Sequence, residues 1–464
     1  MTTTTHQAVQ PEFRWLVILV SIGFFMQALD TTIVNTAIPA MAIQLNENPL
    51  QMHSVIVAYV LSVAACIPLS GWLADRFGIR NIYLSSMVIF SLASLGCGLS
   101  QNLEQLLFFR VIQGIGGALL MPVGRLALLK LIPRSQFLSA MSLMSLAGLI
   151  GPLMGPTLGG WLVEVATWHW IFLINLPMGI LGMIMTFKIM PNQKEPTVKT
   201  FDFSGFILLM VAMVGLSLGI ENMASSQYSN LVSISLLLIG IIATVSYAYH
   251  AHTHQNALFH GRLFRYKIFS IGVLGNFFAR LGSNAIPFIL PLMLQVAFGF
   301  EPFITGLMMI PLVLGSLFSK PIIRPLIQRV GYRRFLLTNT ILVGLCIASF
   351  SFMTAVTPLW LKVLHLFIFG TLNSLQFVGM NTLTLKDLPQ HDASSGNSFL
   401  SMIMMLSMSI GVAMAGTLIN LFSQHFSTTS MSSAFHATLI TLGCINIITA
   451  LIFWQIPKET TDES

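Results

Sequence analysis

The first long apolar stretch of the chain contains an acidic residue, Asp30, accompanied by Gln27, Thr31 and Asn35. The stretch begins at Arg14, so at ~1.5 Å per residue Asp30 lies about 24 Å along a membrane-spanning helix. A carboxylate there costs about 2.5–3.5 kcal/mol on insertion scales, and such residues usually mark ion or proton pathways. The four polar residues recur at helical spacing and form one stripe. The stripe predicts a protonatable site, although a carboxylate merely neutralised by a structural partner would give the same pattern.

A second charged residue inside an apolar run is Arg110, which is followed by Gln113. This run enters the membrane from the opposite side, so Arg110 near its start comes to a depth similar to that of Asp30. A neighbouring arginine favours the ionised carboxylate and burial favours the protonated one, so movement of Arg110 could release or admit a proton. We expect Asp30 and Arg110 to couple transport to protons, with Gln113 in the substrate cavity beside Gln27, Thr31 and Asn35.

The second half of the chain supplies another group of polar residues inside apolar runs. Asn276, Arg280 and Asn284 follow one another at four-residue spacing, and a later run adds Asn373 and Gln376. These five residues are predicted to line the substrate cavity. A cation near the midplane without an obvious local acid favours anionic or zwitterionic substrates. Alternatively, Arg280 pairs with Asp30 and serves structure or coupling alone.

Two glycine-rich motifs indicate moving parts. The segment Gly71–Arg80 ends a predicted span, and its Gly71, Asp75, Arg76, Gly78 and Arg80 are predicted to form a gating latch at the inner face. A solvated charged turn is the simpler reading. The segment Gly148–Gly160 repeats small residues at four-residue spacing, which predicts a flat face for close helix contact, and its two prolines should bend the helix. The residues of this face are Gly151, Pro152, Gly155, Pro156, Gly159 and Gly160.

The composition excludes an ordinary soluble domain. The 464 residues are 55% hydrophobic and 8% charged, against a soluble norm of about 25% charged. The net charge of +7 comes from cations that are scattered singly between apolar runs. Such cations indicate the orientation of the helices in the membrane rather than a nucleic-acid-binding surface. The four cysteines lie in apolar segments without metal-type spacing, so no cofactor, metal or disulfide is expected. A metal site at His250 and His254 is less favoured than an ordinary loop.

The apolar runs predict an all-α integral membrane protein with fourteen transmembrane helices. They lie at 14–38, 52–73, 81–99, 104–130, 136–162, 168–190, 203–221, 230–250, 267–292, 303–326, 335–355, 359–384, 395–422 and 435–456. Basic residues gather in alternate loops, which places both termini in the cytoplasm. The longer connections divide the chain into a six-helix half at 1–190, a linker with two additional helices at 191–266, and a second six-helix half at 267–464. The mixed basic and aromatic segment at 256–267 is expected along the inner interface.

Taken together, these motifs resemble the major facilitator superfamily. Gly71–Arg80 is similar to the family's loop 2–3 motif, Arg110–Gly117 to its fourth-helix motif, and Gly151–Gly160 to its fifth-helix antiporter motif. Leu29–Pro39 and Trp168–Gly179 resemble signatures of the fourteen-span drug:proton antiporter-2 branch. The resemblance implies proton-driven export from the bacterial inner membrane by rocking of the two halves. Two departures stand out: position 169 is His where many relatives have Arg, and the counterpart motif at Arg324–Arg334 lacks the Asp.

We therefore expect a proton-coupled antiporter, acting as a monomer, that exports small organic molecules or drugs across the inner membrane by alternating access. Its partners would be protons, a small-molecule substrate and the lipid bilayer. An exporter of an organic anion or a metal chelate such as iron-citrate is the alternative, and a membrane sensor without transport is a third reading. The chain contains no Gly-x-x-x-x-Gly-Lys-Ser/Thr loop, which disfavours an ATP-driven pump. No cluster of nucleophile, base and orienting residue indicates an enzyme.

Overall fold

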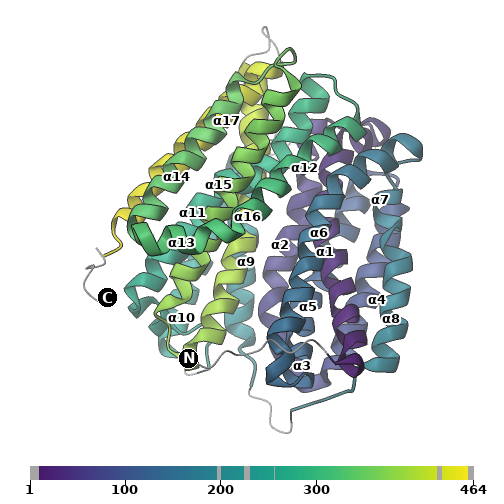
Figure 1. The fold of residues 1–464 in the computed structure, drawn as a ribbon, viewed down its shortest axis with the longest axis vertical. Helices are drawn as coiled ribbons and strands as arrows, with labels where there is room; N and C mark the ends of the chain where they lie inside the picture. Colours follow the sequence, from purple (N-terminus) through teal and green to yellow (C-terminus); the bar gives the residue numbers. More distant parts are fainter. Residues whose placement is uncertain (1–9, 196–199, 224–229, 255, 426–430, 458–464) are drawn as a thin grey trace. The chain divides into compact units, whose positions relative to one another are not determined.

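The computed structural model describes residues 10–195, 200–223, 230–254, 256–425 and 431–457. Within this described part the chain is helical and contains no strand (Figure 1). The first six spans are α1 (Pro11–Leu45), α2 (His53–Cys66) with α3 (Ser70–Phe77), α4 (Ile79–Gly98), α5 (Leu103–Leu131), α6 (Arg134–Val165), and α7 (Trp170–Leu173) with α8 (Asn175–Ile189). Two further spans follow, α9 (Phe203–Asn222) and α10 (Asn230–Thr253).

The last six spans complete the fourteen. They are α11 (Lys267–Leu292), α12 (Pro302–Phe318) with α13 (Lys320–Val330), α14 (Tyr332–Ser349), α15 (Leu359–Lys386), α16 (Gln390–His425) and α17 (Met431–Trp454). Each of the fourteen predicted apolar runs overlaps one of these spans. In the described residues thirteen helices are long and apolar enough to cross a membrane, and the bent pair α12–α13 makes a fourteenth. The prediction of an all-α membrane protein with fourteen transmembrane helices is confirmed.

The tenth span differs from the continuous run predicted at 303–326. Its two helices meet at Ser319 with a bend of 47°. Pro321 stands at the start of α13 and Pro325 lies inside it, and each proline lacks the N–H that an unbroken helix requires. Three basic residues, Lys320, Arg324 and Arg329, also lie on α13. Proline and charge together end the apolar helix, and a short amphipathic helix continues it.

Two glycines make the tight turns between consecutive helices. Gly78 separates α3 from α4 with φ +94° and ψ 144°, and Gly331 separates α13 from α14 with φ +79° and ψ 154°. A side chain is disfavoured at positive φ, so both turns depend on glycine. The loop motif at Gly71–Arg80 and its counterpart at Arg324–Arg334 thus share a backbone turn, although the counterpart has no acidic residue.

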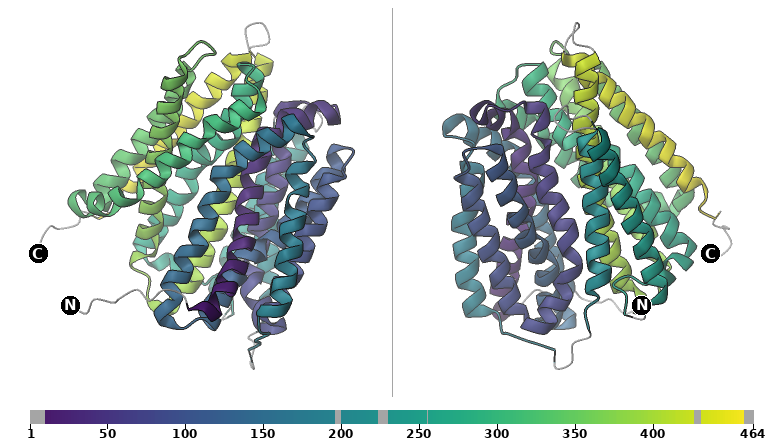
Figure 2. Two further views of the ribbon diagram at one scale, coloured as in Figure 1. Left: turned by 45° about the vertical axis from the view of Figure 1, so that its right-hand side comes forward. Right: turned by 180° about the vertical axis from the view of Figure 1, so that it is seen from behind.

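The helices form two compact units by their contacts. Unit 1 comprises residues 1–47 and 58–201, and unit 2 comprises 48–57 and 202–464. Within unit 1, α1 packs along α6 and α4 along α5; within unit 2, α14 packs along α17 and α12 along α15 (Figures 1 and 2). The two additional helices α9 and α10 pack on each other, and α9 also packs on α16. They therefore belong with the second set of six helices.

Candidate functional site

Asp30 lies at the centre of a buried hydrogen-bond network inside unit 1. Arg110 Nη1 is 2.6 Å from its Oδ2, and Gln113 Nε2 is 2.8 Å from its Oδ1. Asn175 Nδ2 also donates to Oδ1, over 3.3 Å. Asp30, Gln113 and Asn175 are 0% exposed and Arg110 is 1% exposed. Asp30 and Arg110, which the sequence predicted to lie at similar depths, are therefore in direct contact.

Further residues hold the donors in place. Ser94 on α4 accepts hydrogen bonds from Gln113 and Asn175, and Gln113 Oε1 accepts from Arg110 Nη1 over 2.7 Å. The Arg110 guanidinium also lies over the ring of Tyr59, 4.2 Å from its centroid. Five helices, α1, α2, α4, α5 and α8, thus position one ion pair. Such a charge pair tolerates burial because good hydrogen-bond geometry satisfies both partners.

Sequence reasoning did not assign Ser94, Asn175 or Tyr59 to this site. Asn175 stands in the motif Trp168–Gly179, whose resemblance was noted without giving that residue a role. Ser94 and Tyr59 are each flanked by apolar residues in the sequence. Their depth in the membrane, close to that of Asp30, could have indicated that they belong to the site. The sequence does not show, however, which side of each helix faces Asp30.

The glycine-rich face of α6 packs directly on α1 beside Asp30. A Cβ at Gly151 would lie 2.8 Å from the Ala28 Cβ atom, and one at Gly155 would collide with Thr32. Gly159 faces Ile33 in the same way. The Thr36 hydroxyl donates to the carbonyl of Pro156 over 3.1 Å. Small residues are required for this close approach, and the face borders the turn of α1 that carries the acid.

Arg280 is the centre of a second polar cluster, inside unit 2. Its Nε donates to Asn276 Oδ1 over 3.0 Å and its Nη2 to Asn381 Oδ1 over 3.2 Å. Asn276 in turn donates to Thr384. The guanidinium lies 4.0 Å from the centroid of the Phe377 ring, and Arg280 is 5% exposed. Its hydrogen-bond partners among the described residues are neutral, so this buried cation has no carboxylate beside it there.

The other predicted cavity residues have different environments. Gln27 and Asn35 are buried, and the Thr31 hydroxyl donates to the backbone carbonyl of Gln27. Asn284 and Asn373 are half-buried. Gln376 is 1% exposed and is bound by Asn339 and Thr340 of α14. The side-chain amide of Gln376 therefore holds α15 to α14.

The latch motif makes different partners from those expected. Asp75 Oδ1 is 3.0 Å from Lys130 Nζ at the end of α5, and the same ammonium contacts Glu195 Oε1 at 2.5 Å. Arg76 instead lies over the Trp72 ring, and Arg80 over the Phe187 ring. In the described residues, the expected ion pairs of Asp75 with Arg76 or Arg80 are not formed. Gly71 has open space where a side chain would project.

The segment that follows α8, at residues 190–195, contacts this motif. The Glu195 N–H donates to the Asp75 carbonyl, and the Ile79 N–H donates to the Gln193 carbonyl. Asn192 occupies the space where a Cβ of Gly78 would project. The three charged side chains are between 25% and 45% exposed, so their ion pairs contribute little stability compared with the buried pair at Asp30.

His250 lies against the carboxylate of Asp202. Its Nε2 is 2.9 Å from both oxygens of Asp202, and its ring stacks on that of His254. No group of three metal-ligating side chains occurs among the described residues. Burial alone raises the pKa of Asp202, but hydrogen bonds from Gly205 N–H, His250 and Leu258 N–H outweigh it, and the pKa lies below its ordinary value.

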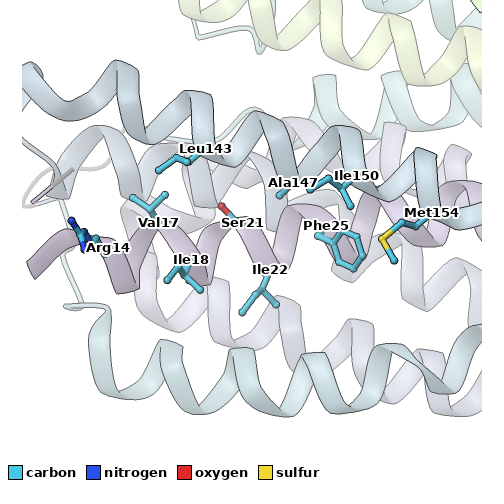
Figure 3. A pocket seen from close by; sticks show the side chains of 10 residues that line it. All are labelled: Arg14, Val17, Ile18, Ser21, Ile22, Phe25, Leu143, Ala147, Ile150 and Met154. Atoms are coloured by element: carbon cyan, nitrogen blue, oxygen red, sulfur yellow. The ribbon is translucent and has the colours of Figure 1, made fainter. Parts of the chain in front are cut away.

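An apolar groove of about 680 Å³ lies between α1 and α6 (Figure 3). Arg14 stands at one end and Met154 at the other, and the lining between them is apolar apart from Ser21. A second pocket, of about 480 Å³, lies between α13, α14 and α15 beside Arg324. Neither pocket is lined by the residues predicted for the substrate cavity.

Comparison with known proteins identifies the family. The model of the Major Facilitator Superfamily matches residues 20–249 and 272–464. The chain is 51% identical over 452 residues to "Putative multidrug resistance protein MdtD" of Escherichia coli O6:H1, covering 96% of this chain and 95% of the relative. It is 49% identical to the protein of the same name from Pectobacterium atrosepticum, covering 97% of both chains.

The fold agrees with solved transporter structures. The crystal structure of a D-xylose-proton symporter superposes with a TM-score of 0.66 at 14% identity, covering 95% of this chain and 97% of the symporter. A peptide transporter, POT, in complex with sulfate gives a TM-score of 0.70 at 15% identity, covering 98% of this chain and 96% of that chain. The chain therefore belongs to the major facilitator superfamily, a family of membrane transporters and not of enzymes.

Proposed function

We propose that the chain is a proton-coupled antiporter that exports small organic molecules across the bacterial inner membrane, with both termini in the cytoplasm. The observation that carries this proposal is the buried Asp30–Arg110–Gln113 network. The names of the relatives, which refer to multidrug resistance, support export of small molecules. The predicted excess of basic residues in alternate loops supports the orientation.

The chemistry of the network links proton binding to movement. Both oxygens of Asp30 accept hydrogen bonds, and the three groups that contact them, from Arg110, Gln113 and Asn175, are donors. A protonated carboxyl group carries an O–H that needs an acceptor. Protonation of Asp30 therefore places its O–H donor against the donors of Arg110, Gln113 and Asn175. It also removes the negative charge that holds Arg110. Arg110 must then move. Proton uptake by Asp30 is therefore coupled to a rearrangement of the five helices that position the ion pair.

The proton gradient can supply useful work through this site. One proton that moves inwards down 100 mV delivers about 2.3 kcal/mol, which corresponds to a concentration ratio of roughly fifty for a neutral cargo. The transfer requires that Asp30 be reached from each side of the membrane in turn. Because Asp30 is 0% exposed here, the described conformation closes it off.

An organic anion or metal chelate, such as iron-citrate, is the second candidate cargo. The specific observation is Arg280, a buried cation whose hydrogen-bond partners in the described residues are the amides of Asn276 and Asn381. A guanidinium held by neutral groups keeps its positive charge available for a carboxylate. A lipophilic cation would be repelled by the same group.

Transport by purified protein in proteoliposomes with an imposed pH gradient tests both proposals. The probes are ethidium, as a cationic dye, and citrate with and without Fe³⁺. Asp30→Asn should abolish gradient-driven accumulation of every transported probe, whereas Glu104→Gln, at an exposed carboxylate, should leave it unchanged. Gradient-driven transport that survives Asp30→Asn contradicts proton coupling at this site.

The charge at position 280 distinguishes the cargoes. Arg280→Gln should reduce citrate transport at least tenfold and leave dye transport within twofold if the site binds an anion. Equal loss of both probes, or transport of the dye alone by the unmodified protein, contradicts the organic-anion proposal while leaving proton coupling intact.

A further inference from the structure

A further acid–base pair, separate from the network at Asp30, joins the start of α2 to the end of α9. Residues 48–57 belong to unit 2, and His53 opens α2 within that segment. His53 Nε2 is 3.7 Å from Glu221 Oε1 at the end of α9, and the two side chains are 9% and 14% exposed. This distance is inside ion-pair range but too long for a hydrogen bond. The transport cycle described above does not use either residue.

The neighbours of His53 fix which of its nitrogens carries the proton. Nδ1 lies 3.0 Å from the backbone carbonyl of Leu50. A carbonyl oxygen can only accept, so Nδ1 must be the donor in this contact. A neutral imidazole carries a single N–H, which leaves Nε2 as a bare lone pair. Consistent with this assignment, Nε2 is buried and has no hydrogen-bond partner among the described residues.

This bare nitrogen faces the Glu221 carboxylate. A lone pair and an ionised carboxylate are both acceptors, so they cannot form a hydrogen bond. One additional proton removes the conflict, whether it makes Nε2–H of an imidazolium or the O–H of a neutral carboxyl group. We propose that His53 and Glu221 form a second proton-binding site, which takes up one proton and closes a hydrogen bond between α2 and α9.

In the part of the chain that the structure describes, the ion-pair contact of Glu221 is with His53, and the other neighbours of the His53 ring are uncharged. Phe288 of α11 makes an edge contact with the His53 ring, and Gly416 of α16 packs directly on it. Among the described residues, His53 is the titratable side chain that lies within ion-pair distance of Glu221. The site is therefore a pair, with one titratable group from α2 and one from α9, and α11 and α16 contribute neutral surfaces.

Hydrogen bonds from α16 hold the end of α9 in place, so a hydrogen bond to Glu221 would fix the first turn of α2 against α9. The Thr417 hydroxyl of α16 donates to the backbone carbonyl of Ile220, next to Glu221. Ser409 of α16 contacts Ser217 of α9 at 3.5 Å. Closing the hydrogen bond at Glu221 therefore fixes the first turn of α2 to a braced helix.

The inference extends the proposed antiporter and rests on its orientation in one respect. With both termini cytoplasmic, the start of α2 and the end of α9 face the outside, where the proton source is. Proton binding there would hold the first turn of α2 closed, and loss of the proton would loosen it. The two additional helices then have a function, because α9 supplies half of the proton site.

Hydrogen–deuterium exchange of the peptide that covers residues 48–57 tests the proposal without a transport assay. The full-length protein is measured in lipid nanodiscs at pH 5.5 and pH 8.5, and the rates are corrected for the intrinsic pH dependence of amide exchange. A hydrogen bond to a charged group should slow exchange about tenfold at the lower pH. Glu221→Gln and His53→Gln can each hydrogen bond to the remaining partner at both pH values, so the corrected rates should no longer depend on pH.

The exposed carboxylate variant Glu104→Gln is the matched control and should behave as the unmodified protein. Corrected exchange that is the same at both pH values in the unmodified protein overturns the proposal, as does a pH dependence that persists in both Gln variants. The exchange measurement does not depend on Asp30. A failure of the antiporter proposal, seen as transport by Asp30→Asn, is therefore separate from a failure here.

Discussion

The contribution of the buried ion pair to stability can be measured with a double-mutant cycle at Asp30 and Arg110. Asp30→Asn removes the negative charge, and Arg110→Met removes the positive charge while keeping most of the side-chain volume. A hydrogen bond to a charged group contributes about 1.5–3 kcal/mol, and breaking a buried pair by removing one partner costs about 3–5 kcal/mol. The structure favours the lower end of the second range. Asp30 keeps two amide donors without Arg110, and Arg110 keeps the Gln113 oxygen without Asp30.

We therefore expect each single substitution to lower the free energy of unfolding by about 3 kcal/mol. The double variant should lose about 4 kcal/mol rather than 6, because it leaves no unpaired charge behind, and the coupling energy is then about 2 kcal/mol. Reversible unfolding in mixed micelles of dodecyl maltoside and SDS, followed by tryptophan fluorescence, gives these differences. Asp75→Asn with Lys130→Met is the matched cycle at a half-exposed pair, where the coupling should be at most about 1 kcal/mol. Additive effects at Asp30 and Arg110 would refute the reasoning.

Three further predictions concern single positions. Asn175→Leu removes one donor to the buried Asp30 carboxylate and should lower the free energy of unfolding in mixed micelles by about 1–3 kcal/mol. Gly78→Ala meets a positive φ and the Asn192 side chain, and should lower the free energy of unfolding in mixed micelles by about 1–2 kcal/mol. Asp202 has a lowered pKa in the folded state, so its contribution is present at neutral pH and is lost as pH falls below about 4. Exchange at the start of α9 should accelerate there, and should not do so in Asp202→Asn.

The sequence predicted the helices and the similar depth of Asp30 and Arg110 for the same reason. Apolar length fixes where a span begins, and the count of residues from its end fixes the depth of each charge. Depth does not fix rotation about the helix axis. Gln376 was therefore expected in the cavity although it binds α14. Asn175, which donates to Asp30, and Ser94, which accepts from Asn175 and Gln113, were not assigned to the site. The direction in which a single polar residue points depends on packing that its own run does not encode.

Proximity in sequence was misleading at the loop motif. Asp75 and Arg76 are neighbours in the chain, but adjacent residues on a helix point in different directions and do not face each other. Lys130 lies 55 residues away and reaches Asp75 because α5 ends beside the turn at Gly78. The same turn receives the segment that ends at Glu195, a tertiary contact that sequence spacing does not indicate. The bend between α12 and α13 was missed for a different reason, because an apolar run was counted without regard to its prolines.

Gln113 is the residue that can link the two states of Asp30. Its amide presents a donor to Asp30 and an acceptor to Arg110, and rotation of the amide by half a turn exchanges the two. When Asp30 is protonated, the rotated Gln113 oxygen can accept its O–H, and Arg110 then loses two acceptors in one step. The freed guanidinium retains the Tyr59 ring, 4.2 Å away on α2. In the proposed antiporter, protonation of Asp30 would change which helix holds the arginine. The α1 helix could respond because Gly151, Gly155 and Gly159 of α6 present no side chain to it beside Asp30.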